Sequence, residues 1–147
     1  MIKQFSVFLE NSPGRLANLM GILEKNGIKV LAMGIAEAGN YGIVRMIVDN
    51  DEKAFDMMRK ENMSVNQAEV LIIELERLAN AVKTLSVVGV NIDYAYTMDC
   101  GRAVIKVNNE EKAIKALSEA GLKVYPTKCR ASCKSAFNIL GQVDYTL

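Results

Sequence analysis

The stretch that decides the fold is NSPGRLANLMGILEKNGIKV, residues 11–30. It opens with four turn-forming residues, Asn11 to Gly14, and reaches a β-branched segment just after Gly27. Between them, apolar residues recur at the i, i+3, i+4, i+7 spacing of an amphipathic helix, at Leu16, Leu19, Met20 and Leu23. We expect Ser12 to cap this helix through its hydroxyl and Pro13 to occupy its first position, where no N–H is needed.

The flanking segments predict three strands and a second helix before a fourth strand begins. Residues 5–9 alternate in polarity, and two apolar segments at 28–36 and 41–49 are joined by the turn EAGN. Residues 50–60 start with a cap-like Asn and carry apolar side chains on one side, and NMSV at 62–65 leads into the next strand. The order strand-helix-strand-strand-helix-strand is typical of the split βαβ arrangement.

The same pattern returns later in the chain. With an offset of 62, Leu16-Ala17-Asn18 falls on Leu78-Ala79-Asn80 and Gly27 on Gly89; with an offset of 59, NDEKA at 50–54 falls on NEEKA at 109–113. We therefore predict an α+β protein of two ferredoxin-like βαββαβ units, with antiparallel sheets, helices on one face, and the units paired side by side. The predicted domains are residues 1–66 and 67–126, followed by a tail, 127–147.

Composition excludes several classes of function. The 147 residues include 18 basic and 17 acidic side chains, which is not the charge balance of a nucleic-acid or anionic-membrane binder. No apolar run is long enough to span a bilayer, and the first residues do not resemble a secretion signal, so we expect a cytoplasmic protein. Without His, neither a His-based triad nor a His metal site can form. We predict no catalytic residue, no metal and no cofactor.

The three cysteines are an odd number, which favours a reduced compartment over a disulfide framework. Cys129 and Cys133 stand one helical turn apart in the tail, but zinc would need two more good ligands. We favour two small residues on a tail helix, over about residues 128–140, with a possible strand at 142–147.

The quoted stretch resembles the ACT domain. The residues that carry the likeness are Asn11-x-Pro13-Gly14, then Leu16 and a helix, then Gly27-Ile28-x-Val30; GVNIDYAY at 89–96 matches the later segment in the second unit. The likeness covers about residues 1–125 and is to small stand-alone proteins with two ACT domains. It implies a regulatory, allosteric module that binds a small ligand, most often an amino acid, at the interface between two paired domains.

The resemblance also implies a ligand site, in which the first strand-to-helix loop of one domain faces the second strand of its neighbour. Here these segments consist of Asn11, Ser12, Pro13, Gly14, Arg15 and Leu16, and of Asn91, Ile92, Asp93 and Tyr94. A helix amino terminus favours a carboxylate, and a glycine lets a ligand approach the backbone. Asp93 supplies a negative charge for an ammonium. The alternative role of Tyr94 is sheet packing, and the alternative reading of the whole corner is a turn and helix start without a ligand.

The second copy departs from this pattern. IIELERLANAV at 72–82 contains neither Pro nor Gly, and Lys29 takes the strand position where the family has Asn. We therefore expect one intact site per chain. The predicted partners are an amino acid or similar metabolite and either a second copy of the chain or a metabolic enzyme. The competing hypothesis is an assembly module with vestigial sites; a small enzyme is rejected because no nucleophile–base pair or cofactor loop is found.

Overall fold

The computed structural model describes residues 1–126 and 128. The first unit contains β1 (Ile2–Glu10), α1 (Arg15–Lys25), β2 (Val30–Ala38), β3 (Tyr41–Val48) and α2 (Asp51–Lys60). The chain continues through β4 (Ser64–Glu74) and a short 3₁₀ helix, η1 (Leu75–Arg77). The second unit then contains α3 (Leu78–Val87), β5 (Ile92–Met98), β6 (Arg102–Val107) and α4 (Glu110–Glu119). The predicted repeat of the βαββαβ order is confirmed.

The two units share one six-stranded antiparallel sheet, in the order β2-β3-β1-β4-β6-β5. The long strand β4 joins them, because it pairs with β1 as far as Val70 and with β6 from Leu71 onward. After α4, Val124 forms an antiparallel bridge with Ile73 and takes the place of a fourth strand in the second unit. The domain boundary predicted after residue 66 falls within β4 and stays a prediction.

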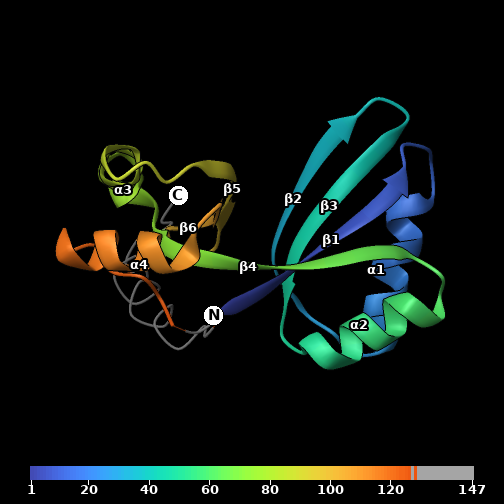
Figure 1. Ribbon diagram of the computed structural model, residues 1–147. Coiled ribbons are helices and arrows are strands. Elements are labelled where there is room, and N and C mark those ends of the chain that lie inside the picture. Colours follow the sequence, from blue (N-terminus) through green and yellow to red (C-terminus); the bar gives the residue numbers. More distant parts are fainter. Residues whose placement is uncertain (127, 129–147) are drawn as a thin grey trace, which may run out of the picture.

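The helices cover the outer face of each half of the sheet, as Figure 1 shows, with α1 and α2 on one side of the molecule and α3 and α4 on the other. Under each helix pair lies a separate hydrophobic core. The first core includes Phe5, Leu19, Leu23, Met46 and Met58, and the second includes Ile73, Leu85, Ile105, Val107 and Leu117. Of the apolar helix positions predicted from the sequence, Leu19 and Leu23 lie in the first core and Met20 packs against it, whereas Leu16 is exposed.

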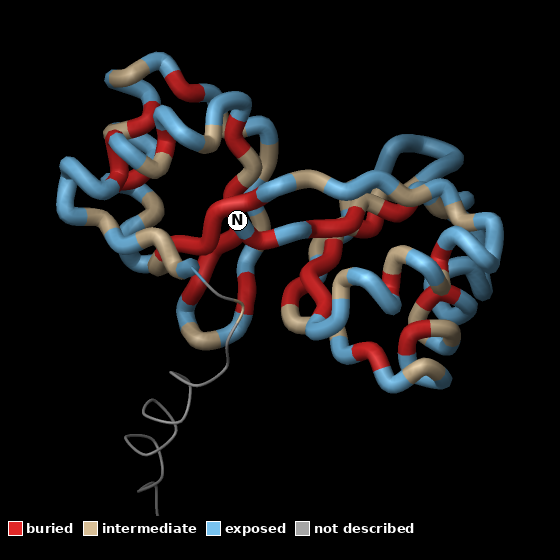
Figure 2. The backbone as a smooth tube through the Cα atoms, turned by 60° about the horizontal axis from the view of Figure 1, so that its bottom comes forward, coloured by how far each residue is buried: buried red, intermediate tan, exposed pale blue. Residues whose placement is uncertain are grey.

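A third core fills the space between the helix-free faces of the two units. It consists of Ile2, Ala32, Ile47, Val70, Ile72, Met98 and Val104, and Figure 2 shows the buried backbone gathered where the units meet. The sheet turns back on itself along β4, so that β2 approaches β5 (Figure 1). A Cβ built on Gly34 would lie only 3.1 Å from the Cβ of Tyr96. The units are therefore closely packed rather than loosely linked.

The start of α1 differs from the sequence-based prediction. The helix begins at Arg15, its N-cap is Gly14 in the left-handed conformation, with φ of 87°, and no side chain caps it. The predictions of a Ser12 cap and of Pro13 at the first helical position are therefore wrong. The reason is that Asn11 is bonded to the β2–β3 turn, so the next two residues form the corner and the helix starts after it. At α2, by contrast, Asn50 caps as predicted, with its side-chain oxygen accepting from the Lys53 N–H.

Three sequence-based expectations remain: the state of the cysteines, the structure of the tail, and the absence of a membrane-spanning helix. Cys100 is disulfide-bonded, so the expectation that the cysteines are reduced thiols is wrong for this residue. The predicted tail helix and strand lie outside the described residues. Within residues 1–126 and 128, no helix has the length and apolar character needed to cross a bilayer.

Candidate functional site

The corner between β1 and α1 is held against the β2–β3 turn. The Asn11 N–H donates to the carbonyl of Asn40 at 2.8 Å, and the Asn11 side chain donates to the carbonyl of Gly39 at 3.1 Å. The Ser12 N–H donates back to the Glu10 carbonyl at 2.9 Å. These bonds fix the corner to a hairpin 28 residues away, so the direction in which α1 leaves the sheet is set by the tertiary fold.

The first turn of α1 presents backbone donors. The Asn18 N–H makes the first i to i−4 bond, to the Gly14 carbonyl at 2.9 Å, and the Arg15 N–H donates to the Ser12 carbonyl at 3.4 Å, so the amides of Leu16 and Ala17 are the ones that lack a helical acceptor. No acidic residue lies in this turn and no side chain caps it. Arg15 forms an ion pair with Glu10 at 2.7 Å, both side chains being more than half exposed, which contributes little to stability. The helix terminus is thus open to an anion from outside.

A small cavity of about 130 Å³ lies beside this corner. Its lining combines corner residues with apolar residues of β2 and β3: Leu9, Glu10, Asn11, Ser12, Leu16, Ile35, Gly42 and Val44. Five of these were not named as site residues from the sequence: Leu9, Glu10, Ile35, Gly42 and Val44. The register brings Gly42 opposite Leu9 and Val44 opposite Val7, and that pairing could not be derived from the pattern along the chain. The lining of the cavity is thus mixed, with the polar residues Glu10, Asn11 and Ser12 beside apolar residues of three strands and of α1.

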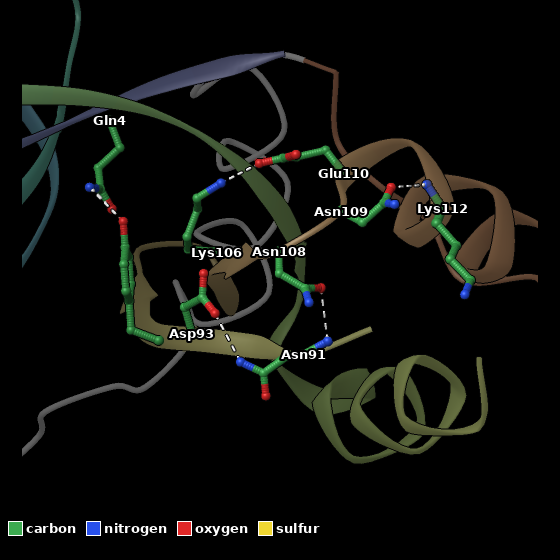
Figure 3. Close-up of polar contacts among 9 residues, drawn as sticks. Gln4, Asn91, Asp93, Lys106, Asn108, Asn109, Glu110 and Lys112 are labelled. Atoms are coloured by element: carbon green, nitrogen blue, oxygen red, sulfur yellow. Dashed lines mark hydrogen bonds and ion pairs between the residues drawn. The ribbon is translucent and has the colours of Figure 1, made fainter. Parts of the chain in front are cut away.

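The predicted strand segment of the second unit has its own contacts. The Asn91 side chain donates to Asp93 Oδ1 at 2.9 Å, and its backbone N–H donates to Asn108 Oδ1 at 3.0 Å, as Figure 3 shows. Both Asn91 and Asp93 are exposed, whereas Ile92 packs against the second core. Tyr94 turns to the first unit instead, where its hydroxyl accepts a hydrogen bond from Gln4 Nε2 at 3.0 Å.

The two predicted halves of the site do not meet within one chain. The β1–α1 corner lies at the outer end of the first unit, whereas β5 lies across β2 and β3 from it (Figure 1). No hydrogen bond or ion pair of the described residues joins Asn11–Leu16 to Asn91–Tyr94. The separation follows from the turn of the sheet along β4, which brings β5 beside β2. A clamp built from both segments therefore requires two chains.

The second unit has no comparable corner, because β4 passes through η1 directly into α3. The Leu75 N–H donates to the Gly101 carbonyl at 2.7 Å. A cavity of about 470 Å³ here is lined by Glu74, Leu75, Glu76, Cys100, Gly101 and Tyr125. Burial, and a hydrogen bond to Glu74 at 3.1 Å, raise the pKa of the Tyr125 phenol. The two carboxylates make this end unsuited to a carboxylate ligand.

Comparison with known proteins shows the family. The family model described as ACT domain pair matches residues 1–128, so the chain belongs to the ACT domain pair family. ACT domains are regulatory domains. None of the curated proteins matches this chain. Within the described residues, no group of three or more Cys, Asp or Glu side chains is placed to hold a metal ion.

Several solved structures share the fold. Protein BT0572 from Bacteroides thetaiotaomicron is 34% identical, with a TM-score of 0.77 and coverage of 84% of this chain and 91% of that one. The ligand-free regulatory subunit of aspartate kinase from Thermus thermophilus is 17% identical, with a TM-score of 0.60 and coverage of 81% and 92%. A putative C-terminal regulatory domain of aspartate kinase from Porphyromonas gingivalis is 20% identical, with a TM-score of 0.53 and coverage of 80% and 91%. The last two likenesses concern the fold alone.

Proposed function

We propose that this protein is a regulatory protein that binds an amino acid or a similar small metabolite, with the ligand carboxylate at the start of α1. The observation that carries the proposal is an uncapped helix terminus with no acidic residue in its first turn, next to a small cavity with a partly apolar lining, where the one carboxylate, that of Glu10, is paired with Arg15. Unpaired amides and the helix dipole favour a carboxylate. The apolar residues of the lining, which include Ile35 and Val44, suit the ligand side chain.

We propose that the strand segment of the second unit, through Asn91 and Asp93, binds the ammonium end of the ligand. Asn91 and Asp93 lie far from the corner of their own chain, so they complete the site only when they come from a second copy. In this arrangement Asp93 supplies the negative charge and Asn91 holds its carboxylate in place. Ligand binding is then coupled to association of two chains, or of this chain with a metabolic enzyme, which is how the signal is transmitted.

The proposal is tested by thermal unfolding with each of the twenty amino acids. A ligand that binds only the folded state stabilises it by about 2.7 kcal/mol at 100 times its Kd, so at least one amino acid is expected to raise the melting temperature. Gly14→Ala should abolish that shift, because a Cβ both strains the left-handed backbone and projects where the ligand approaches.

The matched control is Gly89→Ala. Gly89 has φ of 71°, close to that of Gly14, and an added Cβ meets nothing within 4 Å at either position. Both variants therefore carry similar backbone strain, but Gly89 lies in the second unit after α3. Equal loss of the ligand-induced shift in both variants would show that the effect is general destabilisation, and full retention in Gly14→Ala would exclude the corner as the site.

The exposed edge strand β2 favours one alternative, an assembly module without a ligand. Met33 and Ile35 on this strand are 39% and 53% exposed, and unpaired edge strands readily pair with another chain. Association that depends on protein concentration, measured by sedimentation, with no thermal shift from any amino acid would favour this role.

A further inference from the structure

A group of polar side chains lies inside the junction of the two units, apart from the α1 corner. The register places Ser6 of β1 and Gly34 of β2 on either side of Arg45 of β3. Their neighbours Phe5, Val7, Val44 and Met46 form the core under the helices. Because side chains alternate along a strand, Ser6 and Arg45 face the helix-free side, toward β5 of the second unit.

Gln4 organises this group and is completely buried. Its Oε1 accepts a hydrogen bond from the Tyr96 hydroxyl at 3.0 Å, and its Nε2 donates to Tyr94 Oη at 3.0 Å and to Ser6 Oγ at 3.1 Å. Figure 3 shows the amide of Gln4 directed at its partner on β5. The amide is fully satisfied by these bonds. The hydroxyls of Tyr94 and Ser6 act as acceptors in them, so each keeps a hydrogen that it can donate elsewhere.

Arg45 adds a positive charge without a counter-ion. Its guanidinium carbon lies 3.9 Å from the centre of the Tyr94 ring. Its Nε is buried without a hydrogen-bond partner, and among the described residues no carboxylate forms an ion pair with it. Lys106, opposite Tyr94 in the sheet, is already paired with Glu110. The group thus offers hydroxyl donors and a positive charge, and no carboxylate of the described residues is paired with that charge.

We propose that this junction is a binding site for a small organic carboxylate, held by Arg45 with the hydroxyls of Tyr94 and Ser6. A buried donor left unpaired is costly, and a guanidinium matches a planar carboxylate with two parallel hydrogen bonds. Arg45, Tyr94 and Ser6 are each only partly buried as residues, whereas the Nε atom of Arg45 is buried, so a ligand must enter the junction to reach that atom. Because Arg45 and Tyr94 belong to different units, a bound carboxylate ties the units together.

This site is independent of the one proposed at α1, so each can fail without the other. The probe is sodium acetate, titrated against sodium chloride at constant ionic strength, with the Nε–H resonances of arginine followed by NMR. The Arg45 resonance, assigned through its loss in Arg45→Lys, is expected to move to saturation with acetate. Gly14→Ala should leave this response unchanged.

Two variants and one internal control make the result decisive. Tyr94→Phe and Ser6→Ala each remove one donor and are expected to weaken acetate binding by about tenfold, the usual effect of losing a hydrogen bond to a charged group. Arg59 is the control, because its guanidinium also lies over a ring, that of Phe55, at 5.6 Å, on an exposed helix position away from the junction.

Three outcomes would overturn the proposal. The first is a non-saturating shift of Arg45 that parallels Arg59, which would indicate general ion screening. The second is undiminished acetate affinity in both Tyr94→Phe and Ser6→Ala. The third is a shift of Arg45 on raising the protein concentration without acetate, together with no response to acetate, which would assign the counter-ion to another copy of the chain.

Discussion

The close packing of the two units can be tested at Gly34. This glycine lies in β2 where that strand faces β5, and an added Cβ would lie 3.1 Å from the Cβ and 3.2 Å from the Cγ of Tyr96. Carbon atoms pack best at about 3.5–4.0 Å, so the two strands would have to move apart. Tyr96 cannot easily give way, because its Cβ is tied to the backbone of β5 and its hydroxyl is bonded to Gln4.

The expected cost follows from two opposing effects. Forcing an extra carbon into a packed site typically costs about 1–3 kcal/mol. Replacing glycine by alanine at a compatible backbone conformation returns about 0.4–1 kcal/mol by restricting the unfolded chain. Gly34 is not among the residues with positive φ, so no backbone strain is added. We expect Gly34→Ala to lower the free energy of unfolding by about 1–2 kcal/mol.

The assay is urea unfolding followed by circular dichroism, with Gly42→Ala as the matched control. Gly42 lies in the neighbouring strand β3, also without positive φ, and an added Cβ there would have its nearest atoms at an ordinary 3.9 Å. We expect this control to be unchanged or slightly more stable. If Gly34→Ala proves as stable as Gly42→Ala, β2 and β5 are not in contact in solution. A Tyr96→Ala background removes the Cγ contact but keeps the Cβ contact at 3.1 Å, so there the cost of Gly34→Ala should fall without disappearing.

Two predictions concern pH. The hydrogen bond from Lys106 lowers the pKa of Glu110, so the contribution of this carboxylate to stability is present above its unfolded pKa of about 4.3 and is lost as the pH falls through the lower folded value. Glu110→Gln should therefore lower stability near neutral pH and flatten the acid limb of a urea-unfolding series, whereas Glu111→Gln, which breaks no ion pair seen in the described residues, should do neither. Burial, followed by the neighbouring Tyr94, raises the pKa of Tyr96, so its contribution is present below the unfolded value of about 10 and is lost as the pH rises from there toward the folded value. Tyr96→Phe should reduce the loss of stability above pH 10, and an unchanged alkaline limb would contradict the buried position of this hydroxyl.

Much of the fold was predictable because its signals are local. Helix periodicity identified α1, and the Asn50 cap marked the start of α2, since both depend on residues within one or two turns. The matching NEEKA segment became α4, with its Asn109 side chain accepting from the Lys112 N–H at 3.0 Å. The repeat itself predicted two βαββαβ units, because the apolar positions that form a core recur wherever the same fold recurs.

The site was predictable only in part. The sequence named the corner residues, of which Asn11, Ser12 and Leu16 line a small cavity in the structure, and their role in ligand binding stays a prediction. It did not show that Ile35 and Val44 line that cavity, nor that Asn91 and Asp93 lie away from it. Both facts depend on strand register and on the path of β4, and the spacing of residues along the chain predicts neither.

The order of amino acids is enough to specify two copies of one small fold, the family to which they belong, and the loss of the corner in the second copy, because caps, glycines and apolar periods act over a few residues. Three-dimensional packing alone specifies the shared strand β4, the start of α1 at Arg15 after the Gly14 cap, and the junction where Gln4 meets Tyr94, 90 residues away. Such contacts arise from the twist of the sheet and from side chains that fit across it. They are properties of the assembled chain, because no neighbour in sequence determines them.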